Sequence, residues 1–81
     1  MSPNPMSPNH TQEKLVYMAN QIGKGFTMRK PEQAVLDIAD HLKKFWEKRM
    51  LAQIFEHLDA GGQGLDNLPK QGLQRLRETM Q

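Results

Sequence analysis

Residues 31–58 of this chain read PEQAVLDIADHLKKFWEKRMLAQIFEHL, and their apolar pattern decides the fold class. Apolar side chains recur at spacings of three and four residues, which is typical of an α-helix that buries one face. The apolar positions are Val35, Ile38, Ala39, Leu42, Phe45 and Trp46, followed by Met50, Leu51, Ile54, Phe55 and Leu58. The pattern predicts one helix that begins at Pro31 and another that ends at Ala60-Gly61-Gly62, because proline suits a first helical turn and glycine suits a C-terminal cap.

Weaker patterns on either side of this stretch predict two more helices. The earlier helix is expected to follow an N-cap at Asn9 and to end between Gly25 and Thr27. The later helix is expected to follow an N-cap at Asp66, with Pro69 in its first turn. Their apolar positions are Leu15, Met18, Ala19, Ile22 and Phe26, and then Leu68, Leu73, Leu76 and Met80. Since no segment alternates apolar and polar residues as a strand does, the sequence predicts an all-α protein, a small bundle of three to four helices.

The length and the N-terminal composition indicate one domain behind a tail. The chain has 81 residues, and its first ten, MSPNPMSPNH, include three prolines and almost no side chain suited to burial. A chain of this length is too short for two hydrophobic cores. We therefore expect residues 1–10 to be a disordered tail and residues 11–81 to form a single helical domain.

The composition excludes several kinds of chemistry. The chain has no cysteine, so disulfides, thiolate metal sites and thiol nucleophiles are ruled out. Eleven Lys and Arg against nine Asp and Glu give a formal net charge of +2, far from the concentrated positive charge of a dedicated nucleic-acid binder. No apolar run reaches the roughly 18 residues of a membrane helix, and the N-terminus lacks a secretion signal. We therefore expect a cytoplasmic protein with no membrane or nucleic-acid partner.

Three motifs follow one another along the chain: LVYMANQIG at residues 15–23, IADHLKKFWEKRM at 38–50 and HLDAGGQGL at 57–65. In this order and at these separations they resemble the delta subunit of NAD-dependent formate dehydrogenase. The resemblance implies a small accessory subunit that supports the assembly, maturation or stability of a cytoplasmic complex. Its partners would be the large subunits of formate dehydrogenase, which carry the molybdenum or tungsten pterin, the iron–sulfur clusters and the flavin. This chain itself would hold no cofactor.

The resemblance extends to individual positions. The recurring residues of the family fall here on Met18, Asn20, Gln21, Ile22, Gly23, His41, Phe45, Trp46, Arg49, Met50, Asp59, Gly61, Gly62, Gly64 and Leu65. One position departs from the family pattern, because Lys48 stands where a proline usually precedes the Arg-Met pair. Without that proline, the sequence leaves open whether the two central helices are separate or form one continuous or gently kinked helix.

The Phe45-Trp46 pair is the strongest local feature of the sequence. Neighbouring helical residues point about 100° apart, so one narrow apolar stripe would not bury both rings fully. One alternative is that a wide stripe at the helix end buries both rings in the core. The other is that one ring faces a partner.

Other candidate sites have ordinary explanations. His41 and His57 lack metal-ligand spacing, and we expect each to be a polar boundary residue hydrogen-bonded to a nearby backbone carbonyl. We therefore expect no metal and no catalysis. The sequence DAGGQG follows a helix and lacks the lysine of a phosphate-binding loop, which favours a helix cap and tight turn. A basic cluster is formed by Lys43, Lys44, Lys48 and Arg49. It indicates a solvated helix face, contact with an acidic protein surface or contact with nucleic-acid phosphates.

The sequence therefore predicts a surface for other polypeptides. The expected partner-binding residues are His41, Phe45, Trp46, Arg49, Met50, Asp59, Gly61, Gly62 and Gly64. A fold of this size is marginally stable alone, so we expect either the large subunits or a second copy of the chain to complete its burial. Two alternative functions stay open at this point: a free-standing helical adaptor or homodimer, and a small DNA-binding helical protein.

Overall fold

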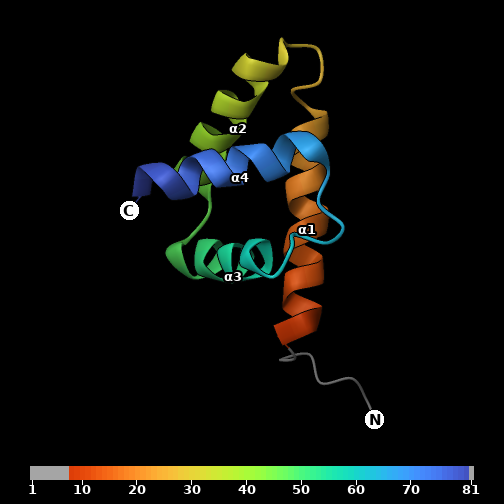
Figure 1. Cartoon of the computed structure of the whole chain (residues 1–81), viewed down its shortest axis with the longest axis vertical. Helices are drawn as coiled ribbons and strands as arrows, with labels where there is room; N and C mark the ends of the chain where they lie inside the picture. The colour runs from red at the N-terminus through yellow and green to blue at the C-terminus, as the bar shows by residue number, and fades with distance from the viewer. Residues whose placement is uncertain (1–7, 81) are drawn as a thin grey trace.

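The structure, a computed structural model, describes residues 8–80 and gives side chains from residue 12 onward. This part of the chain holds four α-helices and no strand, which confirms the predicted all-α class. The helices are α1 (Pro8–Lys24), α2 (Pro31–Phe45), α3 (Lys48–Asp59) and α4 (Asn67–Met80) (Figure 1).

The predicted helix boundaries are confirmed except in the first helix, which also ends at Lys24, just before the expected range. α2 begins at Pro31, and α4 begins directly after Asp66. α1 already begins at Pro8, so Asn9 lies inside the helix and the expectation that it caps the helix is wrong. The proposed disordered tail therefore overlaps α1 at residues 8–10, and residues 1–7 lie outside the described part of the chain.

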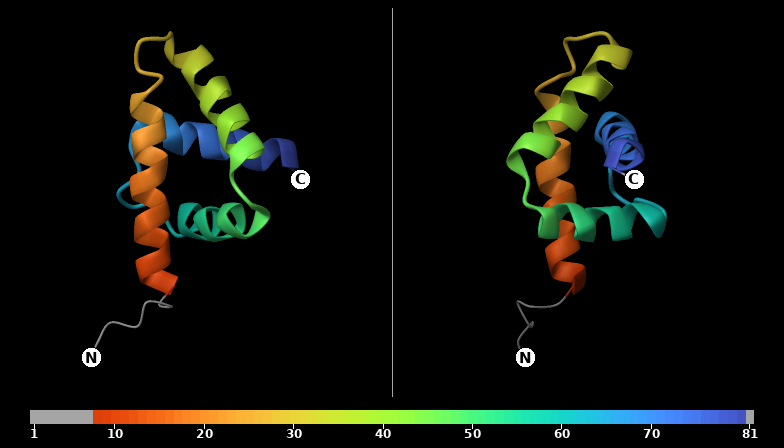
Figure 2. Two further views of the ribbon diagram at one scale, coloured as in Figure 1. Left: turned by 180° about the vertical axis from the view of Figure 1, so that it is seen from behind. Right: turned by 90° about the vertical axis from the view of Figure 1, so that its left-hand side faces the viewer.

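The helices cross one another at large angles. α1 and α2 diverge from the turn at residues 25–30 like the arms of a V, and α3 and α4 lie across these arms (Figure 1). The second panel of Figure 2 shows α4 end-on beside α2, and the packing of α2 against α4 is the most extensive contact between two helices. α4 is therefore the main packing partner of α2.

The core is built from the apolar stripes of all four helices. Its buried members are Leu15, Val16, Ala19, Ile38, Ala39, Leu42, Trp46, Leu51, Ile54, Leu58, Leu73 and Leu76. Ile38, Leu42, Ile54, Leu73 and Leu76 are the largest aliphatic side chains that are fully buried. Each is worth roughly 1.5–3 kcal/mol relative to exposure, so these five positions contribute most to the hydrophobic stabilisation.

α2 and α3 are separate helices, which settles the question that Lys48 left open. Trp46 (φ −93°, ψ 138°) and Glu47 (φ −70°, ψ 156°) are both extended, and α3 begins at Lys48. The Trp46 ring is only 7% exposed and belongs to the core. The break thus occurs without a proline, because burial of the indole stabilises the extended backbone that ends α2.

Gly72, which weakens the helix prediction for α4, has a clear packing role. A Cβ atom added at this position would lie 2.7 Å from Cγ2 of Ile38 on α2. No real Cβ atom tolerates that distance, so the absence of a side chain is what permits α2 and α4 to approach so closely. The close packing of α2 against α4 thus compensates for the low helix propensity of glycine at this position.

Substitution of Lys48 by proline should keep or raise stability. Lys48 is the first residue of α3, where the amide has no partner within the helix, and the extended Glu47 suits a residue that precedes proline. We expect K48P to raise the free energy of unfolding by about 0.4–1 kcal/mol in urea titrations. The matched control A52P, at an exposed position inside α3, should instead cost about 3 kcal/mol or more. Equal losses in both variants would contradict the assigned break.

Substitution of Gly72 by alanine should destabilise the fold. Helix propensity alone would give a gain of about 1 kcal/mol, whereas overpacking against Ile38 costs about 1–3 kcal/mol, so the difference is a net loss of up to about 2 kcal/mol. Thermal unfolding followed by circular dichroism measures this loss. The control Q71A, at the exposed neighbouring position, should leave the melting temperature unchanged or slightly raised. A stabilised G72A variant would contradict the close approach of α2 and α4.

Candidate functional site

The structure divides the predicted partner-binding residues into two groups at opposite ends of α3. The first group, His41, Phe45, Trp46, Arg49 and Met50, lies where α2 turns into α3, and we name this region the α2–α3 corner. The second group, Asp59, Gly61, Gly62 and Gly64, follows the C-terminal end of α3. Met50 and Asp59, the members of the two groups that are nearest to each other along α3, are nine residues apart, or roughly 14 Å along the helix axis. They therefore form two surfaces, and each is described in turn.

At the α2–α3 corner the two neighbouring aromatic residues have different environments. Trp46 is buried, whereas Phe45 is 69% exposed. The alternative in which both rings pack in the core is therefore wrong for Phe45. Trp46 belongs to the core of the described chain, so its predicted contact with a partner remains a prediction without exposed surface to support it.

Phe45 continues a row of aromatic rings along one side of α2. Its ring centroid lies 4.7 Å from that of His41, which in turn lies 6.3 Å from that of Phe26, in an edge-on arrangement. The guanidinium of Arg29 lies over the Phe26 ring at 5.7 Å from the ring centre, within cation–π range. These four side chains line an open groove of about 310 Å³ between the turn after α1 and the surface of α2.

Two ion pairs border this groove. Nε of Arg29 lies 3.4 Å from a carboxylate oxygen of Asp37, and Nζ of Lys44 lies 3.1 Å from a carboxylate oxygen of Asp40. Asp40 and Lys44 stand four residues apart on α2, a spacing that brings opposite charges together on one helix face. Because each charge has a partner, the aromatic row is the feature of this groove that is left to attract another molecule.

The groove includes residues that sequence reasoning did not select as a site. Phe26 was assigned to the apolar stripe of the first helix, but α1 ends at Lys24 and Phe26 lies in the following turn. Arg29 belongs to the same turn and was not singled out. The available signal was the pair of glycines, Gly23 and Gly25, which marks the end of the helix just before these two residues.

At the other end of α3, the glycine-rich segment caps the helix as predicted. The amide of Gly62 donates to the carbonyl of His57 at 2.9 Å, and the amide of Gly61 donates to the carbonyl of Leu58 at 3.1 Å. This pair of bonds is the Schellman motif, and it requires a left-handed backbone, which Gly61 supplies with φ of 120°. The structure therefore confirms a helix cap and tight turn at DAGGQG.

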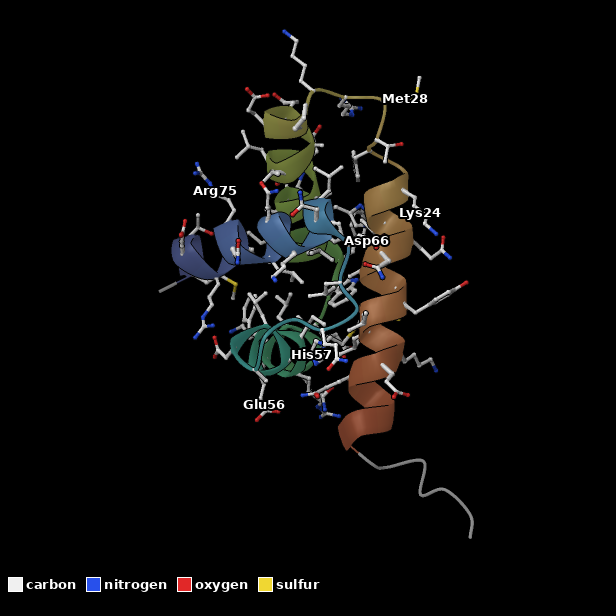
Figure 3. The ribbon with its side chains drawn as sticks, turned by 45° about the vertical axis from the view of Figure 1, so that its right-hand side comes forward. Lys24, Met28, Glu56, His57, Asp66 and Arg75 are labelled. Carbon is white, nitrogen blue, oxygen red and sulfur yellow. The ribbon has the colours of Figure 1, made fainter. Side chains whose placement is uncertain are left out.

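Side chains from α1 and α3 hold this segment in place. The side-chain amide of Asn20 donates to the carbonyl of Gly64 at 2.9 Å and accepts from the amide of Asp66 at 2.8 Å. Nε2 of His57 donates to the carbonyl of Gln63 at 2.7 Å, which confirms the expected carbonyl partner for this histidine. Figure 3 shows Asp66 where the segment passes beside α1. The glycine-rich segment is thus fastened to the body of the fold.

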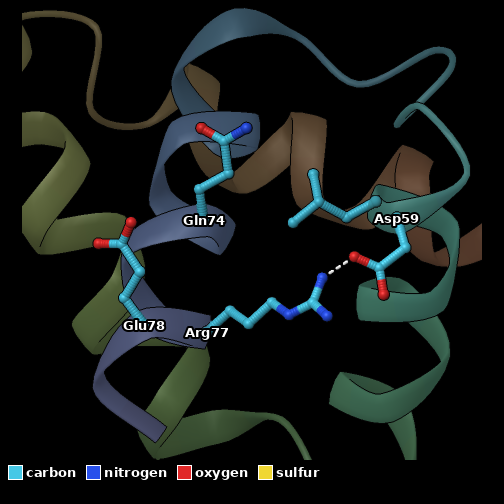
Figure 4. A pocket seen from close by; sticks show the side chains of 5 residues that line it. Asp59, Gln74, Arg77 and Glu78 are labelled. Carbon is cyan, nitrogen blue, oxygen red and sulfur yellow. Dashed lines mark ion pairs between the residues drawn. The ribbon is translucent and has the colours of Figure 1, made fainter. Parts of the chain in front are cut away.

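Asp59 is also bound within the chain. Its carboxylate forms an ion pair with the guanidinium of Arg77 on α4, across an open hollow of about 540 Å³ (Figure 4). Leu58, Gln74 and Glu78 line the rest of this hollow. Asp59 therefore links α3 to α4, and its predicted contact with a partner remains a prediction.

Two further features, a metal-binding cluster and a membrane-spanning helix, are absent from the described residues. Among them, no three or more His, Asp and Glu side chains gather in a way that could hold a metal ion. None of the helices in this part of the chain has the length and apolar character needed to span a bilayer.

Comparison with known proteins identifies the family. The model of the family described as NADH-dependent formate dehydrogenase delta subunit FdsD matches residues 14–73. The chain belongs to this family. A search of curated proteins and a search of solved structures each gave no match.

The match to the delta-subunit family includes both ends of α3. It begins two residues before Val16 on α1 and ends at Leu73 on α4, so it contains the α2–α3 corner and the glycine-rich segment. Within this span, Asn20, Gly61 and Gly62 make hydrogen bonds that hold the glycine-rich segment. Phe45 and Arg49 are instead exposed to solvent. Of these motif residues in the delta-subunit fold, the two at the corner are the ones whose side chains are exposed to solvent.

Removal of the Asn20 side chain should loosen the glycine-rich segment. N20A loses two partly exposed hydrogen bonds, so we expect a loss of about 1 kcal/mol in the free energy of unfolding. The amide of Asp66 should also exchange with deuterium faster, because it donates directly to Asn20. The control Q21A changes an exposed neighbour and should alter neither quantity. An unchanged exchange rate for Asp66 in N20A would show that the contact is not formed in solution.

Proposed function

We propose that this chain is a non-catalytic accessory subunit, the delta subunit, of a cytoplasmic NAD-dependent formate dehydrogenase. In this role it binds the large subunits and supports the assembly, maturation or stability of their complex. The observation that carries the proposal is the family match over residues 14–73, which takes in most of the helical part of the chain.

The ion pairs and the hydrogen bond of three aspartates and one histidine support a non-catalytic role. Asp37, Asp40 and Asp59 are each joined to a basic side chain, and His57 is bound to a backbone carbonyl. General acid–base catalysis depends on a side chain that is free to exchange a proton with a substrate in a shielded site. Asp37, Asp59 and His57 instead join different elements of the fold, and Asp40 pairs with Lys44 within α2.

The α2–α3 corner supports a role in binding. Phe45 is a large apolar side chain that is mostly exposed, and it extends the aromatic row formed with His41 and Phe26. A single exposed aromatic residue is ordinary on a protein surface, but a row of rings along a groove offers a continuous area for a partner to cover. We propose that a large subunit covers this row.

The proposed partner also accounts for the small size of the fold. If residues 11–81 form a single domain, its core is close to the lower limit for independent stability. Binding to the folded form adds stability by mass action, and the large subunits would provide it. The role of Trp46 is then to hold the corner in the shape that presents Phe45.

Replacement of Phe45 by alanine tests the proposal. The tagged full-length chain is co-expressed with the large subunits of formate dehydrogenase from the same organism and captured, and the co-purified large subunits are quantified. We expect F45A to reduce capture by about tenfold or more, because a central aromatic side chain at an interface commonly contributes more than 1 kcal/mol. The melting temperature should not change, since Phe45 is 69% exposed.

The matched control is Y17A. Tyr17 is an aromatic residue on α1 that is 64% exposed, and its loss should leave capture unchanged. Failure of the wild-type chain to capture any large subunit would overturn the proposed function. Capture of a second copy alone would indicate the homodimer, and retention on DNA would indicate the nucleic-acid binder.

A further inference from the structure

The α2–α3 corner carries a concentration of positive charge around its exposed aromatic residue. Four of the seven residues from 43 to 49 are basic, and one is acidic. We name the four cations the basic cluster, which consists of Lys43, Lys44, Lys48 and Arg49. All four are exposed, and Phe45 lies between them in the chain. The surface therefore combines an apolar centre with a positively charged surround.

Most of this charge is not neutralised within the fold. Lys44 pairs with Asp40, and both side chains are more than half exposed. The two other ion pairs in the part of the chain with described side chains are Arg29–Asp37 and Arg77–Asp59. Lys43, Lys48 and Arg49 take part in none of these three pairs. An excess of positive charge is thus left at the corner, although the whole chain carries a formal charge of only +2.

The positions of the cations in their helices separate them into two classes. Lys43 lies in the last turn of α2, where a positive charge interacts favourably with the helix dipole. Lys48 and Arg49 lie in the first turn of α3, where the same dipole disfavours a positive charge. Glu47 is the N-cap of α3 but makes no capping hydrogen bond through its side chain. Lys48 and Arg49 therefore gain no stabilisation from the helix dipole, and they take part in none of the three ion pairs above.

Apolar surface borders the basic cluster on both sides of α2. Lys44 lines the groove that contains the aromatic row, and Lys43 lines a second groove, of about 250 Å³, between α2 and α4. This second groove contains Leu36, which is 42% exposed, and Arg75, which Figure 3 shows on the outside of α4. A partner that fits this surface needs carboxylates to meet the cations and apolar side chains to meet the grooves.

We propose that the basic cluster binds an acidic surface with apolar side chains on a large subunit of the formate dehydrogenase complex. This inference rests on the proposed function, and it adds the chemistry of the partner surface. Carboxylates placed against Lys48 and Arg49 would neutralise charges that α3 disfavours, so folding and binding make opposite demands on these two positions. A protein surface is favoured over nucleic acid because Glu47 interrupts the cluster and because exposed apolar side chains border it.

Reversal of two charges tests this inference in the full-length chain. Equilibrium and kinetic binding of K48E/R49E to the purified large subunits is measured at about 50 mM and about 300 mM salt. Charges about 10 Å apart still interact at the lower salt concentration, whereas the higher concentration screens them strongly. We expect the dissociation constant to rise at least about tenfold at low salt, mainly through slower association, and the difference to shrink at high salt. The melting temperature should be equal or higher, because acidic residues suit the first turn of α3.

The matched control is K14E/K24E, which makes the same change in net charge on α1. It should change the dissociation constant by no more than about threefold, because these lysines lie on α1 and line neither of the two grooves beside the corner. Equal weakening by both double variants would show a general charge effect and overturn the inference.

Two other results separate this inference from the proposed function. If F45A loses binding while K48E/R49E binds like the wild type at both salt concentrations, the acidic partner is wrong and the accessory role stands. If K48E/R49E abolishes binding to duplex DNA and leaves binding to the large subunits unchanged, the basic cluster serves nucleic acid. Absence of any binding by the wild-type chain would refute the proposed function itself.

Discussion

The close packing of α2 against α4 is the constraint on which the rest of the structure depends. The two helices meet where Gly72 leaves room for Ile38, and both flanks of this contact are filled by fully buried leucines. α3 lies between α2 and α4 in the sequence, so this contact joins segments that are distant along the chain. Once it forms, the directions of α1 and α3 are restricted, because each also packs against α4.

The break between α2 and α3 follows from the same core. Trp46 fills space beneath the corner, and its burial requires an extended backbone that ends α2 at Phe45. The residue before the tryptophan is thereby left facing solvent, and the residues after it begin a new helix with two cations in its first turn. A feature of the core thus creates the surface that we propose for binding, which links the stability of this delta subunit to its function.

The glycine-rich segment shows how a sequence motif can serve the fold. Its positive-φ glycines close the Schellman motif, and Asn20 and His57 fasten the carbonyls of the segment to the neighbouring helices. Asp59 adds an ion pair to α4. These residues occur in the family motifs, and each has a structural reason for its identity that does not need a partner. The motif residues at the corner do not have such an explanation, apart from Trp46 and Met50, which pack on the core.

The sequence by itself determined the helical class, the helical stretch that begins at Pro31, the glycine cap that ends it and the family. These depend on local spacing and on turn chemistry, which a periodic pattern carries directly. Only the tertiary structure decided that Trp46 is buried while Phe45 is exposed, that Gly72 is a packing site, and that Phe26 joins His41 in one groove. Each of these facts depends on which helix lies opposite a residue. That choice is made by side chains distant in the sequence, which a local pattern does not record.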